Sequence, residues 1–354
     1  MRGEYLRGSV WLDALTPKQA RLCSSIYNEL REEGFNLFVT ARDYAETLQI
    51  LELEGVPYRA VGRYGGASKS EKLIAYASRA QKLVNEVNSI ELCALISLSS
   101  PSAVRVAFGL GIPTITLNDT PHAFHVGRLT LPLSTRVISP LAIPRRELIR
   151  LGAEEDSIMQ YDGVDEVAWV RSHNPNPNVL KELGLEQDDL FVVVRPPEEK
   201  AAYLSNLSLG GFSDLINFIV SKGAKVILFP RYPDQRRLAE KVNGVVIPRR
   251  ATDTLSLYSY SSMIITGGGT MAREGSMLGI PSISLFPLDY PLYVNDYLRE
   301  KGFPIYRFRR YEDALPLISR ILEHPEDYRV NTRRLLIDME SPLEPIKSAL
   351  KEIC

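Results

Sequence analysis

The chain contains few cysteines, no long apolar run and no excess of charge of either sign. Its 354 residues include only Cys23, Cys93 and Cys354, an odd number of widely separated cysteines. This spacing excludes a disulfide-rich scaffold and matches no zinc site, although it leaves a free thiol open. We therefore expect a reducing compartment, with the cytoplasm as the default location.

Two further absences limit the classes of partner. No stretch reaches the ~18 consecutive apolar residues of a membrane-spanning helix, and the first residues, MRGEYLRGSVWLD, lack the apolar core of a signal peptide. The formal net charge is −1, so the overall electrostatics do not indicate nucleic-acid binding. The length is sufficient for two domains, each with its own core.

Segments typical of strands and helices alternate along the chain, which predicts an α/β fold with parallel sheets. Residues 174–178 read Asn-Pro-Asn-Pro-Asn and suit neither element, because proline lacks an N–H donor and restricts the residue before it. We expect a first domain over residues 1–165, a linker over 166–189, a second domain over 190–325 and a helical tail over 326–354.

The apolar runs that predict strands are short. We expect them at residues 9–12, 36–40, 58–61, 92–98 and 114–117 in the first half, and at 190–195, 225–230, 245–247, 263–266 and 282–286 in the second. Thr16 and Pro17 are expected to begin the first helix as its N-cap and first residue. The tail is expected to break near Pro342 and Pro345, and it is long enough to cross back onto the first domain.

The most informative stretch is TGGGTMAREGSMLGIPSISLFP, residues 266–287. Its glycines allow the backbone to approach a ligand closely, and the helix that follows directs its positive end at the same loop, which favours an anion such as a diphosphate. We predict that Glu274 binds a ribose and that the diphosphate lies on Gly267, Gly268, Gly269 and Thr270. The alternative is a tight turn followed by a solvated glutamate.

The first half nearly repeats this stretch. GLGIPTITL at residues 109–117 matches MLGIPSISL at residues 277–285 in six of nine positions, and the same offset places residues 99–102 on the glycine loop. This indicates two related α/β halves, with chance likeness between two strand–helix–strand units as the alternative. Because only the second copy has the glycines and the glutamate, we expect the nucleotide to bind the second half.

Ligands of open α/β sheets bind beyond the carboxyl ends of the strands, so residues that follow strands are candidates. In the second half these are Arg195 and Arg231, whose guanidinium groups match phosphate oxygens. The alternative for each is an ordinary surface ion pair.

The first half has its own candidates at strand ends. Asp13, Asp119 and His122 are candidates for acid/base chemistry. An imidazole titrates near neutral pH, and Asp119 could orient His122 or serve as the base itself. Asp13 has the alternative of a helix-entry residue, and His122 that of a surface or packing residue. We expect three further polar residues on the acceptor side: Ser99, Ser100 and Asn118.

Five arginines and several leucines are interleaved after His125. Only Glu147 opposes Arg128, Arg136, Arg145, Arg146 and Arg150. Such a surface suits peripheral contact with an anionic membrane or a lipid-linked acceptor. The alternative is a solvated helix flank with leucines in the core.

The glycine stretch resembles the donor motif of GT-B enzymes, namely the peptidoglycan N-acetylglucosaminyltransferase and the non-hydrolysing UDP-N-acetylglucosamine 2-epimerases. The resemblance implies two Rossmann-like domains with parallel sheets that face a central cleft. It also places the diphosphate on Gly268 and Gly269 and the ribose on Glu274. The epimerases' histidine- and arginine-rich signature is missing, because Arg-Pro-Pro-Glu stands at residues 195–198.

Nearly the whole chain is more similar to a prokaryotic domain-of-unknown-function family of GT-B type, which brings no established reaction. The matching stretches are TPKQ (16–19), TARDY (40–44), RVAFGLGIP (105–113), ND-PHA (118–123), LPLST (131–135) and DEVAW (165–169).

These patterns lead to three hypotheses. The first is a metal-independent glycosyltransferase that moves a sugar from a nucleotide-diphosphate donor, a UDP-sugar by resemblance, to an acceptor hydroxyl, with no cofactor. The second is a nucleotide-sugar 2-epimerase, and the third is a non-catalytic nucleotide-sugar-binding protein. The sequence leaves the sugar and the acceptor open, and fold alone does not decide among the three hypotheses.

Overall fold

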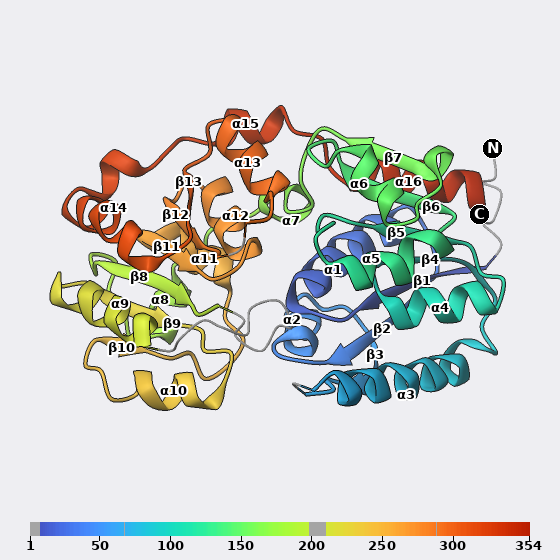
Figure 1. The fold of residues 1–354 in the computed structure, drawn as a ribbon, viewed down its shortest axis with the longest axis horizontal. Coiled ribbons are helices and arrows are strands. Elements are labelled where there is room, and N and C mark those ends of the chain that lie inside the picture. The colour runs from blue at the N-terminus through green and yellow to red at the C-terminus, as the bar shows by residue number, and fades with distance from the viewer. Residues whose placement is uncertain (1–7, 67, 198–209, 288) are drawn as a thin grey trace. The chain divides into compact units, whose positions relative to one another are not determined.

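The computed structural model describes residues 8–66, 68–197, 210–287 and 289–354 (Figure 1). The chain forms two compact units, Met1–Trp169 with Met339–Cys354, and Val170–Asp338. We call them unit 1 and unit 2. Each is built on one parallel sheet, with seven strands in unit 1 and six in unit 2. The predicted class, two Rossmann-like α/β domains, is confirmed, while the domains' roles and a cleft between them stay predictions.

The sheet of unit 1 has the order β3-β2-β1-β4-β5-β6-β7. Its strands are β1 (Ser9–Ala14), β2 (Leu37–Asp43), β3 (Arg59–Arg63), β4 (Leu92–Leu98), β5 (Thr114–Leu117), β6 (Arg136–Pro140) and β7 (Ile158–Tyr161). The order reverses between β1 and β4, and doubly wound sheets bind ligands beyond the carboxyl ends of such a strand pair.

Crossover helices join these strands. They are α1 (Pro17–Glu32), α2 (Thr47–Leu53), α3 (Lys69–Val87), α4 (Pro101–Gly109), α5 (Phe124–Thr130) and α6 (Arg145–Arg150). Helix α7 (Val167–Val170) follows the last strand. Helix α1 contacts α2, and α3 contacts α4, which in turn contacts α5. The predicted start of α1 is confirmed, because the Thr16 side chain accepts from the Gln19 amide and Pro17 is the first helical residue.

The C-terminal helix α16 (Leu343–Ile353) belongs to unit 1, where it packs on α1, β4, β6 and β7. Lys347 Nζ donates to Glu29 Oε1 at 2.7 Å, and Arg136 pairs with Glu352 at 2.9 Å. The predicted break near Pro342 is confirmed, because α15 (Arg333–Ile337) ends before it and α16 begins at Leu343, whereas Pro345 itself does not break the helix. Pro345 lies in the first turn of α16, where amides have no acceptor within the helix and proline is tolerated.

Cys354 is bonded to Cys93, in the second position of β4, and Cys23 is a buried free thiol. The two bonded residues are separated by 261 positions, so their spacing in the sequence gave no sign of the pair. Disulfides persist mainly in oxidising surroundings, so this bond does not favour the reducing compartment that the sequence predicts.

We expect Cys354→Ser to lower the free energy of unfolding by about 2–4 kcal/mol, because the bond closes a very long loop of the unfolded chain. Denaturant unfolding of both proteins, with and without dithiothreitol, measures the effect. Dithiothreitol should destabilise only the unsubstituted protein. Equal stability of the two proteins without reductant would show that the bond contributes nothing.

The sheet of unit 2 has the order β10-β9-β8-β11-β12-β13 and reverses between β8 and β11. Its strands are β8 (Phe191–Arg195), β9 (Lys225–Leu228), β10 (Val245–Val246), β11 (Met263–Thr266), β12 (Ser282–Leu285) and β13 (Ile305–Phe308). Its helices are α8 (Asn178–Glu182), α9 (Gly210–Ser221), α10 (Pro233–Ala239), α11 (Thr254–Tyr260), α12 (Thr270–Met277), α13 (Tyr293–Glu300), α14 (Tyr311–Glu323) and α15 (Arg333–Ile337).

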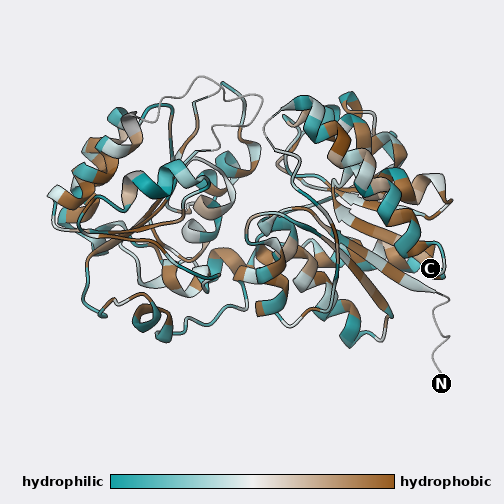
Figure 2. Cartoon of the chain, turned by 90° about the horizontal axis from the view of Figure 1, so that it is seen from below, coloured by the Kyte–Doolittle hydropathy of each residue, from teal (hydrophilic) through white to brown (hydrophobic). Residues whose placement is uncertain are grey.

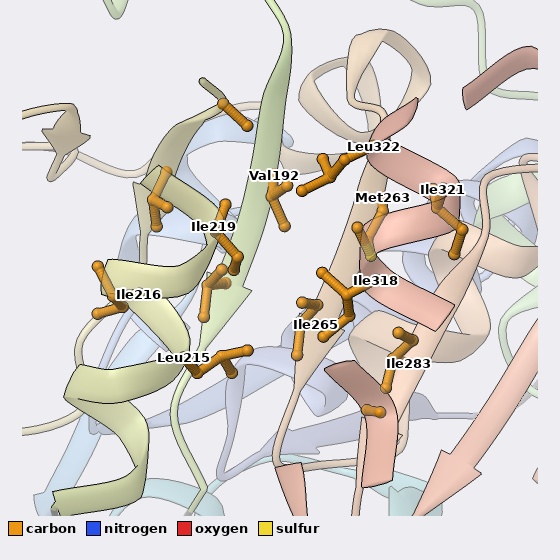
Figure 3. Close-up of a cluster of buried hydrophobic side chains, with 14 of the residues drawn as sticks. Val192, Leu215, Ile216, Ile219, Met263, Ile265, Ile283, Ile318, Ile321 and Leu322 are labelled. Atoms are coloured by element: carbon orange, nitrogen blue, oxygen red, sulfur yellow. The ribbon is translucent and has the colours of Figure 1, made fainter. Parts of the chain in front are cut away.

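Apolar side chains hold each layer in place. Val192, Met263 and Ile265 of the sheet meet Ile219 of α9 and Ile318 of α14 in one buried cluster (Figure 3). Figure 2 shows that the strands of both sheets carry mainly hydrophobic residues, whereas the helices carry both kinds. This is the pattern of parallel sheets covered on both faces. No helix in the described parts of the chain has the length and hydropathy needed to span a membrane.

The internal repeat falls on equivalent elements. The segment β4-α4-β5 of unit 1 corresponds in sequence to β11-α12-β12 of unit 2, and each begins with the strand at which the sheet order reverses. The stretches that the sequence singles out therefore occupy the position in each sheet where doubly wound folds bind ligands.

Candidate functional site

The glycine loop of unit 2 connects β11 to α12. A Cβ at Gly267 would lie 2.1 Å from Pro197 Cα, so this position is closed to side chains. A Cβ at Gly269 would lie 2.6 Å from Arg273 Nη1, so the guanidinium would have to move. A Cβ at Gly268 would make only an ordinary contact with Arg231 Nη2 at 3.6 Å, so the middle glycine has room beside it at the N-terminus of α12, where backbone amides and the helix dipole favour an anion.

Two arginines flank this space. Arg231 follows β9, and its Nε donates to the Pro196 carbonyl at 2.9 Å, which directs the guanidinium toward Gly268. Arg273 of α12 is 8% exposed and donates weakly to Asn295 Oδ1 at 3.4 Å. Arg195 ends β8, and its carbonyl accepts from the Gly267 amide at 3.0 Å, so its backbone holds the loop.

Arg273 and Asn295 were not among the residues predicted from the sequence. A signal for Arg273 was its position one turn into the helix that follows the glycines. Asn295 of α13 is 5% exposed, and its buried Nδ2 has no hydrogen-bond acceptor in the described structure. An unsatisfied buried donor costs about 1–3 kcal/mol, so a ligand oxygen that accepted from it would be stabilised.

Glu274 is buried on α12, with 3% of its surface exposed. This excludes the solvated glutamate that was the alternative to a ligand contact. Thr270 begins α12 and lies partly exposed beside the loop. The ribose contact of Glu274 and the diphosphate contact of Thr270 stay predictions.

In unit 1, Asp13 is the centre of a buried polar network. Arg79 of α3 donates from Nη2 to Oδ1 at 2.6 Å and from Nη1 to Oδ2 at 3.2 Å. The hydroxyls of Thr40 and Ser100 donate to the same carboxylate at 2.5 and 2.6 Å. Because both oxygens are occupied and the side chain has 0% exposure, the geometry favours a structural role for Asp13 and Ser100 over the predicted catalytic and acceptor roles.

Asp119, which follows β5, belongs to a second polar cluster. Lys18 Nζ lies 2.5 Å from Asp119 Oδ2, 2.7 Å from Asp165 Oδ2 and 3.5 Å from Glu166 Oε1. Tyr161 donates to Asp165 Oδ1 at 2.7 Å. We call Lys18, Asp119, Asp165 and Glu166 the Lys18 cluster.

Electrostatics make the Lys18 cluster suitable for holding a proton. Burial raises the pKa of Asp165, and the charges of Asp119 and Glu166 raise it further, while Lys18 opposes the rise. The raised pKa means that the Asp165 carboxyl holds its proton to a higher pH than an exposed aspartate does, a property that acid/base sites use.

The remaining candidates of unit 1 lie near this cluster in sequence. Asn118 Nδ2 donates to Ser99 Oγ at 3.1 Å, and Ser99 adopts a left-handed φ of +50°, which is strained for a residue with a side chain. His122 is partly exposed, three residues beyond Asp119 in the same loop. Ser99, Asn118 and Asp119 thus follow the neighbouring strands β4 and β5.

Comparisons with known proteins agree with this fold. The family described as "Protein of unknown function (DUF354)" matches residues 8–348. An uncharacterised protein of Methanocaldococcus jannaschii is 31% identical over 345 residues, which is 95% of each chain.

Solved structures show the same architecture at low identity. The UDP-GlcNAc 2-epimerase of M. jannaschii, in complex with UDP-GlcNAc and UDP, has a TM-score of 0.72 at 16% identity and covers 97% of this chain and 99% of its own. The Neisseria meningitidis epimerase bound to UDP-GlcNAc has 0.71 at 14%, covering 97% and 100%. The spinosyn forosaminyltransferase has 0.62 at 15%, covering 98% and 100%. These likenesses establish the GT-B fold alone.

Proposed function

Because the chain belongs to the DUF354 family and has the GT-B fold, we propose that it is a glycosyltransferase that uses a nucleotide-diphosphate sugar. Unit 2 holds the donor, a UDP-sugar, and unit 1 presents the acceptor hydroxyl. The observation that carries the proposal is the room beside Gly268, which lies near the N-terminus of α12 and faces Arg231. Its neighbour Gly269 lies against Arg273.

The donor site is built for a diphosphate. The Gly268 amide donates to Thr266 Oγ1 at 3.2 Å, so the amide of Gly269 and those of the first turn of α12 are the backbone donors offered to the diphosphate. The dipole of α12 and the guanidinium groups of Arg231 and Arg273 also favour negative charge. In the transfer, the bond from the sugar to the β-phosphate breaks and the leaving diphosphate gains charge. The same groups stabilise that charge without a metal ion.

Unit 1 supplies the proton acceptor. As the acceptor oxygen forms its bond to the sugar, its proton passes to the carboxylate of Asp119, which Lys18 orients. His122 is the second candidate for this role. The identity of the acceptor stays open, and a lipid-linked alcohol is one candidate. An acceptor of this kind goes with a protein in the cytoplasm that makes peripheral contact with a membrane.

An epimerase remains the second candidate, because the Lys18 cluster offers several carboxyl groups for proton transfer at a sugar carbon. Incubation with UDP-GlcNAc alone separates the hypotheses. Epimerisation proceeds without an acceptor, transfer requires one, and a non-catalytic protein only binds. An epimerised product formed without an acceptor would replace the transferase proposal with the epimerase. Binding of UDP-GlcNAc with no product, whether or not an acceptor is present, would favour the non-catalytic binding protein.

Glu274→Ala is expected to weaken UDP binding by about 1–3 kcal/mol, the cost of losing a charged hydrogen-bond partner. Isothermal titration calorimetry with UDP measures the change. Because Glu274 is buried, the melting temperature of the variant must be measured beside its affinity.

Gly268→Ala is the matched test of the loop, since its methyl group would lie 3.6 Å from Arg231 Nη2, the nearest atom of the described residues beyond its two chain neighbours. We expect an unchanged melting temperature with weaker UDP binding, because the methyl group enters the space assigned to the diphosphate. Unchanged affinity in both variants would remove the donor site from this loop.

A further inference from the structure

Helices α5 and α6 of unit 1 present an outward face that the fold does not use. Phe124 and Leu129 of α5 and Ile149 of α6 are 44%, 50% and 42% exposed, and Arg128, Arg146 and Arg150 are exposed between them. We call these six residues the α5–α6 face. In α6, Ile149 and Arg150 follow Arg146 by three and four residues, and in α5, Arg128 follows Phe124 by four, so these residues are neighbours on one side of each helix.

The two helices form one continuous surface. The guanidinium carbon of Arg150 lies 5.8 Å from the centre of the Phe124 ring. On the inner side, Gly127 of α5 packs against Leu151 at the end of α6, where an added Cβ would lie 2.7 Å from Leu151 Cδ1. Helix α5 also contacts α4, whose end exposes Phe108 and Leu110. The inner residues attach the pair to unit 1, and the outer residues remain available.

The face is positively charged although the whole chain carries a formal net charge of −1. Glu147 is the single acid within α5 and α6, and Arg150 pairs with it at 3.0 Å. Arg145 is directed away, since it donates to the carbonyls of Glu155 and Ile158. Arg136 lies in β6 and pairs with Glu352, so it is not part of this face.

We propose that the α5–α6 face rests on the surface of an anionic membrane. Phe124, Leu129 and Ile149 enter the boundary between headgroups and acyl chains, and the arginines bind lipid phosphates. The positive charge of the arginines complements anionic headgroups, and the apolar side chains between them suit the boundary beneath the headgroups, so the pattern favours a lipid surface.

Sedimentation with lipid vesicles tests this proposal independently of the reaction. The protein should bind vesicles of phosphatidylcholine with phosphatidylglycerol, bind phosphatidylcholine alone far less, and dissociate as salt is raised. Arg128→Gln/Arg146→Gln should lower the partition coefficient about 30-fold, at about fivefold for each arginine near the surface. Phe124→Ser/Leu129→Ser should lower it on the same vesicles.

Helix α15 offers matched controls, because Arg333, Arg334 and Ile337 are exposed there on unit 2. Arg333→Gln/Arg334→Gln and Ile337→Ser should leave partitioning unchanged. Absence of binding to the anionic vesicles, or an equal loss in the α15 variants, would overturn the proposal. Unchanged melting temperatures in all variants would show that the losses are not caused by unfolding.

Discussion

Replacing Arg79 with methionine is expected to lower the free energy of unfolding by about 3–5 kcal/mol. Arg79 is 3% exposed and donates to both oxygens of Asp13, to the Val61 carbonyl at 2.8 Å and to Ser102 Oγ at 2.6 Å. It thereby joins α3 to β1, β3 and the start of α4. Methionine keeps much of the length of the side chain but leaves the Asp13 carboxylate buried without its counter-charge.

Urea unfolding of unit 1, followed by tryptophan fluorescence, measures this loss, because Trp11 lies in β1 and donates to Thr40 in the same network. Arg63→Met is the matched control. Arg63 pairs with Asp43 at 3.6 Å, but the two side chains are 88% and 54% exposed, so the expected loss is below about 1 kcal/mol. Similar losses in the two variants would mean that the buried network adds no specific stability.

Asp13→Asn separates the structural role of Asp13 from a catalytic one. The amide fills the same volume but leaves the guanidinium of Arg79 without a negative partner, so the variant should also be destabilised. A variant that kept its stability and lost turnover would restore Asp13 as the base that the sequence predicts.

The repeated strand–helix–strand unit could be predicted from the sequence because its signals are local. The Gly-Ile-Pro connector ends a helix and begins a strand within a few residues, and the apolar strands before it are continuous. These features placed β4, β5 and β11 correctly.

Three strands were not expected. Strand β6 begins at Arg136, among leucines and arginines that suggest a surface. Strands β7 and β13 carry few consecutive apolar residues, and the edge strand β13 reads Ile-Tyr-Arg-Phe. Such strands form because a neighbouring strand supplies their hydrogen bonds, which the local sequence does not record.

The Lys18 cluster shows the same limit for the site. Lys18 meets Asp119 and Asp165 across 101 and 147 positions of sequence. Their meeting depends on the strand order that places the carboxyl ends of β1, β5 and β7 at one edge of the sheet. Lys18 and Asp165 do occur in the stretches TPKQ and DEVAW that resemble the family, but resemblance alone did not assign them a role.

Asp119→Asn is expected to lower turnover about 10²–10⁴-fold and to leave UDP affinity unchanged, because a general base contributes about that factor. The fold should tolerate the change. Lys18 keeps Asp165 at 2.7 Å and Glu166 at 3.5 Å as counter-charges, and asparagine fills the volume of the aspartate. Donor affinity should not change, since the proposed diphosphate site belongs to unit 2.

The measurement is UDP release from UDP-GlcNAc in the presence of an acceptor extract, with UDP affinity determined by calorimetry on the same preparations. Asp156→Asn, an exposed carboxylate of the same unit, is the control and should retain full turnover. His122→Ala decides between the two candidates in the loop. If it abolishes turnover while Asp119→Asn retains it, His122 is the base and the Lys18 cluster only holds β5 and β7 in place. If both variants keep full turnover, the proton passes to a residue outside this loop. That residue must lie within about 3 Å of the acceptor oxygen or reach it through one water.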